Sequence, residues 1–291
     1  MPIFALLTPM LGCTTTELSE SWRIDRLRVL GVAAEPAEPR PGDRVTFTSL
    51  VVSPDVAVAS TVWFACLVGG DDFGCSIDES LLDTLDPSGE LSPDDLEALY
   101  AAGFIGAEPY LPPVWNVPLD ALDALAPEDR LEGLTAIVNV TAIPEPSSEG
   151  EELDESDLEL AYKRVPVSEA VSPNRNPIIA AIALDGVEIP EGTVASIDRG
   201  QPYTITVALS DESVETYPFV NKEGVEETRT EEPYLTWYAE AGEFDQTNDL
   251  WPYFEAIYYP PDDAAPDAKV WVVVRDRRGG MAWTALALRY R

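Results

Sequence analysis

Carboxylates are the most abundant groups in this sequence that could carry out chemistry. Two Asp or Glu side chains about 5 to 10 Å apart can hydrolyse a glycosidic bond by acid/base catalysis. The chain has 53 acidic residues among 291, and no pair stands out by its spacing. An acid/base glycosidase is therefore kept as an alternative, and we assign no catalytic residue.

Other catalytic groups are missing from the sequence. There is no histidine, which excludes Ser-His-Asp and Cys-His arrangements and the histidine-containing zinc sites. No G-x-S-x-G turn, P-loop or G-x-G-x-x-G motif occurs. The sequence predicts a protein that is not an enzyme and needs no cofactor.

Aromatic residues are the candidates for binding. Residues 233–259 hold the densest group of them, and Trp251 and Tyr253 fall in a proline-containing segment that we expect to loop. Their rings either form a platform for a sugar or a partner protein, or pack over the end of a sandwich. Tyr110 and Trp115 lie in the proline-rich segment Glu108–Trp115, which either crosses a sheet edge as a strap or presents both rings to a protein.

The charge balance limits the partners. With 18 basic residues against 53 acidic ones, the net charge is −35. Such a field repels phosphate backbones, so we expect no nucleic-acid binding. It also disfavours contact with anionic headgroups through a basic patch, so membrane attachment would require a lipid. Basic proteins, cations and neutral glycans remain as partners.

The N-terminal residues indicate how a lipid would be attached. An apolar run from Ile3 to Leu11 ends in Met10-Leu11-Gly12-Cys13, and it is too short to span a bilayer, which takes about 20 residues. This run resembles the lipobox of bacterial envelope lipoproteins. The resemblance implies a signal peptide over residues 1–12, a lipid on Cys13 and a tether over residues 13–21. It also implies an outer-membrane protein that faces the periplasm or the cell surface, because Thr14 rather than Asp follows the cysteine.

The remaining cysteines fit that resemblance. If Cys13 carries a lipid, Cys66 and Cys75 are left as a pair, and an envelope protein is expected to bridge them. The segment Leu67–Gly74 between them is rich in Gly and Asp, which favour a reversing loop. We predict a Cys66–Cys75 disulfide, with two buried free thiols as the alternative.

Two similar sets of short alternating segments must position these residues. Residues 40–48 and 198–206 each place a turn glycine before an alternating strand, and each is followed by a strand with a tryptophan, Trp63 and Trp237. This pattern predicts an all-β fold of two β-sandwiches. The tryptophans resemble the core of immunoglobulin (Ig)-like domains. The resemblance implies tandem Ig-like domains over residues 22–170 and 171–291.

The first domain is expected to carry a small helical insertion over residues 71–133. Ser92 can cap a helix, with Pro93 in its first turn and Asp95 completing a capping box. Leu99 and Tyr100 would line one face until Gly103 ends the helix.

The join between the domains, Val171–Pro177, contains two prolines and is expected to be a rigid linker. Calcium at this join is the alternative. Near the C-terminus, we expect Arg275, Arg277 and Arg278 to pair with nearby carboxylates.

Together these features predict a non-catalytic surface lipoprotein that acts in adhesion, scaffolding or the attachment of an envelope assembly. Its expected partners are envelope or extracellular proteins. The first alternative is a carbohydrate-binding module that uses the aromatic residues of the second domain. The second is the glycosidase.

Overall fold

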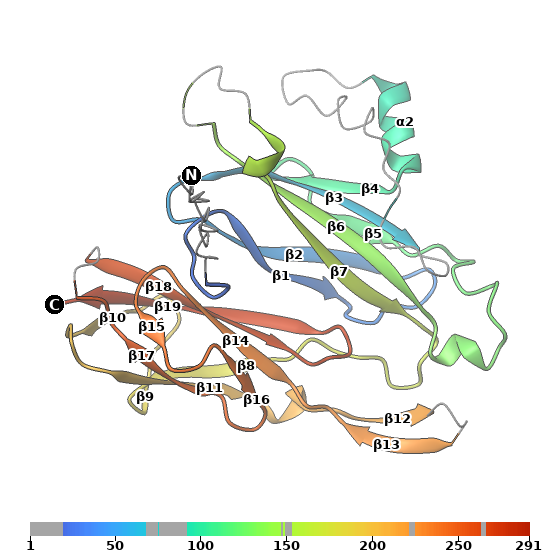
Figure 1. Ribbon diagram of the computed structural model, residues 1–291. Coiled ribbons are helices and arrows are strands. Elements are labelled where there is room, and N and C mark those ends of the chain that lie inside the picture. The colour runs from blue at the N-terminus through green and yellow to red at the C-terminus, as the bar shows by residue number, and fades with distance from the viewer. Residues whose placement is uncertain are drawn as a thin grey trace, which may run out of the picture.

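The computed structural model describes residues 20–67, 75, 92–146, 148, 153–220, 225–262 and 266–291. The chain is mostly β, and its strands form two pairs of facing sheets that lie side by side (Figure 1). Among the described residues, no helix has the length and apolar character needed to cross a membrane.

The first sheet pair is built from the N-terminal half of the chain. One sheet has the order β1-β2-β5 and the other β4-β3-β6-β7, all antiparallel. The strands are β1 (Arg28–Glu35), β2 (Arg44–Val52), β3 (Val58–Leu67), β4 (Phe104–Glu108), β5 (Val114–Asn116), β6 (Leu134–Pro144) and β7 (Glu159–Val167). Alternate side chains of both sheets enclose one core, in which Phe47 stacks on Trp63. The two sheets therefore form a sandwich.

The second sheet pair is built from the C-terminal half. Its sheets have the orders β10-β19-β18-β14-β16 and β15-β17-β11-β8-β9, and β10 runs parallel to β19. The strands are β8 (Ile179–Leu184), β9 (Val187–Glu188), β10 (Val194–Ile197), β11 (Tyr203–Leu209), β14 (Tyr234–Ala239), β15 (Glu243–Phe244), β16 (Asn248–Leu250), β17 (Glu255–Tyr259), β18 (Asp267–Arg275) and β19 (Met281–Tyr290). A separate core fills the space between them.

Each core contains the tryptophan that was predicted for it. Trp63 on β3 and Trp237 on β14 are fully buried. Each indole N–H still finds an acceptor: Trp63 donates to Thr61 Oγ1 (2.8 Å) and Trp237 to Asp249 Oδ2 (2.6 Å). These bonds satisfy the one polar group that a tryptophan brings into a core. The prediction of a β-sandwich fold is confirmed.

The described residues contain the helix α2 and three 3-10 turns. Helix α2 (Pro93–Ala101) begins after Ser92, whose hydroxyl accepts from Asp95 N while Asp95 accepts from Ser92 N, as predicted. Leu99 is buried, but Tyr100, expected on the same face, is 56% exposed. The 3-10 turns are η2 (Asp129–Leu131), η3 (Glu155–Asp157) and η4 (Asp211–Ser213).

Two findings go beyond the sequence. Part of the range 71–133, assigned above to a helical insertion, forms β4 and β5, which pair with β3 and β2. A hairpin of β12 (Thr216–Val220) and β13 (Glu226–Thr230) forms a two-stranded sheet outside both sheet pairs.

The disulfide between Cys66 and Cys75, with Cα atoms 5.5 Å apart, confirms the predicted pairing.

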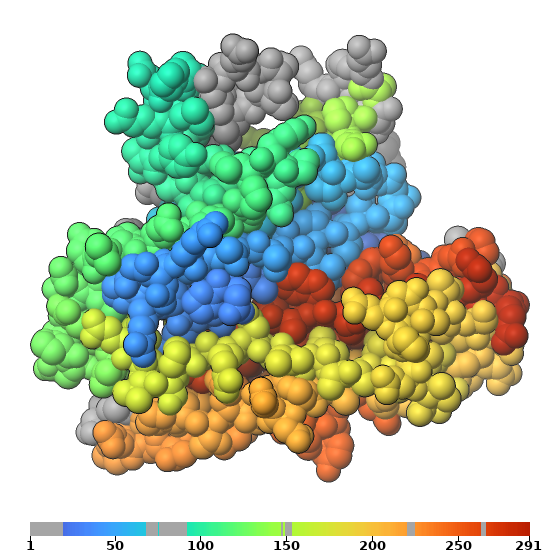
Figure 2. Space-filling model, turned by 180° about the vertical axis from the view of Figure 1, so that it is seen from behind, coloured from blue at the N-terminus to red at the C-terminus, as the bar shows by residue number. Residues whose placement is uncertain are grey.

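A third apolar cluster joins the two sheet pairs. Leu30 and Val52 of the first pair pack against Tyr238, Trp271 and Val273 on the outer face of the second. Seen from behind, the N-terminal strands lie directly against the C-terminal ones (Figure 2). The outer face of one sheet is therefore buried by the other sheet pair.

Candidate functional site

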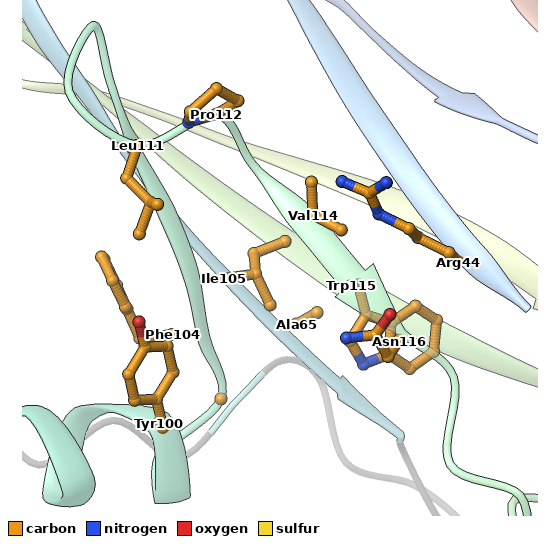
Figure 3. A pocket seen from close by; sticks show the side chains of 11 residues that line it. Arg44, Ala65, Tyr100, Phe104, Ile105, Leu111, Pro112, Val114, Trp115 and Asn116 are labelled. Atoms are coloured by element: carbon orange, nitrogen blue, oxygen red, sulfur yellow. The ribbon is translucent and has the colours of Figure 1, made fainter. Parts of the chain in front are cut away.

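A hollow opens on the side of the first sheet pair, between the edge strands β4 and β5. Its volume is about 580 Å³, within the range of roughly 300–1,000 Å³ typical of ligand sites. Figure 3 shows that its side chains come from three directions: the end of α2, the segment 109–113 between β4 and β5, which we call the strap, and the strands themselves. We call this hollow the edge groove. It is lined by Arg44, Ala65, Tyr100, Gly103, Phe104, Ile105, Leu111, Pro112, Val114, Trp115 and Asn116.

The groove exists because the two sheets are not closed on this side. β4 is the last strand of its sheet and β5, with three residues, is the last of the other. No described strand bridges them. Core residues Ile105 and Trp115 therefore reach the floor of the groove, although both remain buried.

The strap closes one end of the groove. Leu111 and Ala107 exchange backbone hydrogen bonds (2.7 and 2.9 Å), and Phe47 N donates to Pro113 O (3.2 Å). The strap passes so close to β4 that a Cβ on Gly106 would lie 2.6 Å from Pro113 Cα. Leu111 is thus held at the rim with 41% of its surface exposed.

The end of α2 forms the opposite wall. Leu99 packs against Phe64 and Phe104 and anchors the helix on the outer face of the sheet. Tyr100 lies beside Phe104, with ring centroids 5.9 Å apart. The helix thereby places an exposed aromatic ring over an apolar floor.

The lining of the groove holds few charged groups. Arg44 is its one charged lining residue. Exposed Glu97 is one helical turn from Tyr100, and Glu108 at the end of β4 accepts a hydrogen bond from Thr61 Oγ1 (3.1 Å). The lining contains no pair of carboxylates, so the chemistry it offers is burial of apolar surface.

Tyr110 and Trp115 do not form the exposed pair that one interpretation of the sequence proposed. Tyr110 is 85% exposed at the turn of the strap. Trp115 is only 7% exposed and belongs to the core, because pairing of β5 with β2 turns its side chain between the sheets. The prediction that both rings are presented to a partner is therefore wrong for Trp115. The alternative, in which the segment crosses the sheet edge as a strap, agrees with the path of the chain.

Trp251 and Tyr253 lie in the other sheet pair, in the turn between β16 and β17. Trp251 is 37% exposed and packs edge-on against Phe254, whereas Tyr253 is 80% exposed. Leu250 beside them is 62% exposed. These three residues form an apolar tip separate from the edge groove.

A buried polar network, which we call the joint, connects the two sheet pairs through the linker. Arg278 forms ion pairs with Glu38 (3.2 Å), Glu215 (3.3 Å) and Glu231 (3.0 Å). Asn174 of the linker donates from its backbone to Glu38 (2.6 Å) and from its side chain to Asp276 (2.9 Å). These bonds tie the linker to both sheet pairs.

The three arginines near the C-terminus behave differently. Arg277 and Arg278 pair with carboxylates as predicted, Arg277 with Glu232 at 3.7 Å. Arg275 instead donates to the backbone oxygen of Leu30 (2.9 Å) and so links the two sheet pairs directly.

Burial shifts the pKa values of two groups at the joint. Desolvation lowers the pKa of Lys163 to about 8, although nearby Asp276 acts in the opposite direction. Its ammonium donates to the backbone oxygen of Gly279. Desolvation also raises the pKa of Glu231, against the effect of its bond with Arg278. The joint thus holds charges at a cost in solvation.

Metal ligands are not gathered anywhere in the described part of the chain. No three His, Cys, Asp or Glu side chains there are placed to hold an ion. In the linker, where calcium was the alternative, Arg175 pairs with Glu215 at 2.7 Å. Cys13 lies outside the described residues, so the lipid attachment stays a prediction.

Comparison with known proteins gives distant similarities in structure. No family model and no curated protein matches the sequence. Red sea bream transglutaminase is 12% identical over 92% of this chain and 32% of its own, with a TM-score of 0.24. Murine CEACAM1b is 10% identical over 91% of this chain and 100% of its own, with a TM-score of 0.22. This chain thus spans about a third of the transglutaminase.

Proposed function

We propose that this protein is a non-catalytic binding module of the bacterial cell envelope, held at the outer membrane by a lipid on Cys13. In this proposal each sheet pair is an Ig-like domain, and the first carries an insertion whose helical part is α2. The lipobox-like N-terminus and the Cys66–Cys75 disulfide support an envelope protein.

The observation that carries the binding function is the edge groove. It combines an apolar floor, exposed rims at Tyr100 and Leu111, and two strand edges. Interfaces bury such aromatic and aliphatic anchors at their centre. An extended polypeptide fits a hollow between strand edges, as in other cases of strand recognition.

Charge defines the partner further. The chain carries a net charge of −35, and α2 and β4, which contribute to the groove, carry Glu97 and Glu108, although the lining residue Arg44 is basic. A partner segment with apolar residues flanked by Lys or Arg would be attracted and correctly oriented. We therefore propose a basic envelope protein as the occupant.

Site-specific photo-crosslinking in intact cells tests this proposal. A photoreactive residue at Tyr100 is expected to capture a discrete partner. The control position is Tyr162 on β7, a tyrosine of similar exposure (60%) at the opposite edge of the sheet that contains β4. A photoreactive residue there should not capture this partner. Leu111→Asp should remove the Tyr100 adduct, whereas Leu160→Asp on β7 should leave it. Identical results at both tyrosines would contradict the groove as the site.

The exposed tip favours a second candidate function. Trp251 and Tyr253 could stack on a sugar ring, since both expose aromatic surface in one turn. Glycans should then quench tryptophan fluorescence, and Trp251→Ala should abolish the quenching. Absence of quenching across a broad glycan panel would retire this candidate.

A further inference from the structure

The hairpin β12–β13 projects from the body of the protein (Figure 1). All residues of β13 are exposed. A two-stranded hairpin is marginally stable in water, and a third strand is what normally stabilises it. Within the described part of the chain, the hairpin therefore lacks the third strand that would normally stabilise it.

The base of the hairpin is fixed by the joint. Arg278 lies 4.1 Å over the ring of Tyr217, and Arg229 lies 3.4 Å over the ring of Phe219. Glu231, just after β13, is buried and bonded to Arg278. These contacts preorganise the hairpin, which we call the arm, for binding.

The register decides which edge is open. Glu231 N donates to Glu215 O, so this pair points its backbone groups inward. Because inward and outward pairs alternate in an antiparallel ladder, Thr216–Thr230, Pro218–Thr228 and Val220–Glu226 point outward. Pro218 has no N–H and blunts the edge of β12. The edge of β13 presents three complete backbone groups, at Glu226, Thr228 and Thr230.

The sequence of β13 is complementary to itself. Two antiparallel copies centred on Thr228 pair Glu226 with Thr230, so the outward-pointing residues of one copy meet those of the other. Glu227 then lies opposite Arg229 of the second copy, on one face of the sheet. Within one chain Arg229 already contacts Glu227 of its own strand (3.1 Å), so the two charges lie on the face where the exchange would occur.

We propose that two copies of this chain pair antiparallel along β13 and form a continuous four-stranded sheet around a two-fold axis at Thr228. Pro218 lies on both outer edges of that sheet and stops growth at the dimer. The net charge opposes association, but the arm extends away from the sheet pairs, and charges more than about 8 Å apart are largely screened at physiological ionic strength. A single strand pair is a small interface, so the dimer is weak.

Exchange of charges between copies tests the proposal. Sedimentation of the full chain at up to about 1 mM should show dimers, which is the range suited to weak association. Glu227→Arg alone places like charges opposite each other, as does Arg229→Glu alone, and each should weaken dimerisation about tenfold or more. An equimolar mixture of the two variants pairs opposite charges and should restore the dimer.

A cysteine at the axis gives an independent measurement. Residues directly opposite in an outward-pointing pair have Cα atoms about 5.5 Å apart, which suits a disulfide. In a Cys13→Ser background, Thr228→Cys should oxidise to a covalent dimer, whereas Thr216→Cys on the blunted edge should not. A wild-type chain that stays monomeric, or a variant mixture that does, would overturn the proposal and leave the edge to a strand from another protein.

Discussion

Some residues of this protein have their side chains fixed by contacts with residues that are distant in the sequence. Lys163 on β7 is nearly buried against the second sheet pair, where it donates to Gly279 O and approaches Asp276. Burial disfavours its charged form. The residue therefore links the stability of the joint to pH.

The direction of that link follows from the lowered pKa. Below pH 8 Lys163 is charged in both the folded and the unfolded chain. Between pH 8 and its ordinary value of 10.5, the unfolded chain binds more protons, so its contribution to the free energy of unfolding rises with pH, by at most a few kcal/mol. Lys163→Met should remove this rise in urea titrations, and the same change at exposed Lys269 should not. Equal pH profiles for wild type and Lys163→Met would contradict the expectation.

At the scale of elements, the edge groove depends on how closely its strap approaches β4. The strap contacts β4 where Gly106 has no side chain, and backbone bonds of Ala107 and Leu111 hold it there. The groove is thus a property of two edge strands and their connection together.

Gly106→Ala tests that dependence. The added methyl group meets the backbone of Pro113, so the strap must shift, at a cost of about 1–3 kcal/mol in the free energy of unfolding. Urea denaturation measures the loss, and faster proteolysis within residues 109–113 would locate it. Unchanged stability and proteolysis would show that the strap is not held as described.

The disulfide stabilises another element, the end of β3. Cys66 and Cys75 close a short loop, with a sequence separation of 9. Replacing both cysteines by alanine should lower the free energy of unfolding by about 2–3 kcal/mol, since the unfolded chain gains freedom. The comparison is with wild type under oxidising conditions. Under reducing conditions the difference should shrink, and a difference that persists would contradict a role for the bond.

At the scale of the whole molecule, an apolar contact and the joint hold the two sheet pairs together. Gly31 on β1 lies where a Cβ would come 3.0 Å from Met281 Sδ and 3.1 Å from Trp283. Arg278 and Asn174 add ion pairs and hydrogen bonds between the halves. We expect the two sheet pairs to unfold as one unit.

Gly31→Val should separate that contact. The larger side chain cannot fit against Met281 and Trp283 without moving them, so we expect a loss of about 1–3 kcal/mol and a shift toward two unfolding transitions. Calorimetry measures both effects. Ala180→Val, at an exposed position of β8, adds a similar side chain without this contact. A single unshifted transition in Gly31→Val would argue against a shared interface.

Local patterns in the sequence determined much of this protein. The alternation around Trp63 and Trp237, the cap at Ser92 and the pairing of Cys66 with Cys75 were all predictable, because each depends on neighbours in the chain. The hairpin β12–β13 was missed, since Glu226–Thr230 has no apolar alternation. A glycine in the five residues that separate its strands was the available signal.

Only the tertiary structure decided which elements cover the faces of the strands. Whether Trp115 is displayed or buried depends on its partner strand β2, and the contact of Glu38 with Arg278 joins positions 240 residues apart. Alternation shows that a strand has two faces, but it does not say which other element will cover the second one. That choice is made by long-range packing, which leaves the edge groove and the arm uncovered among the described residues.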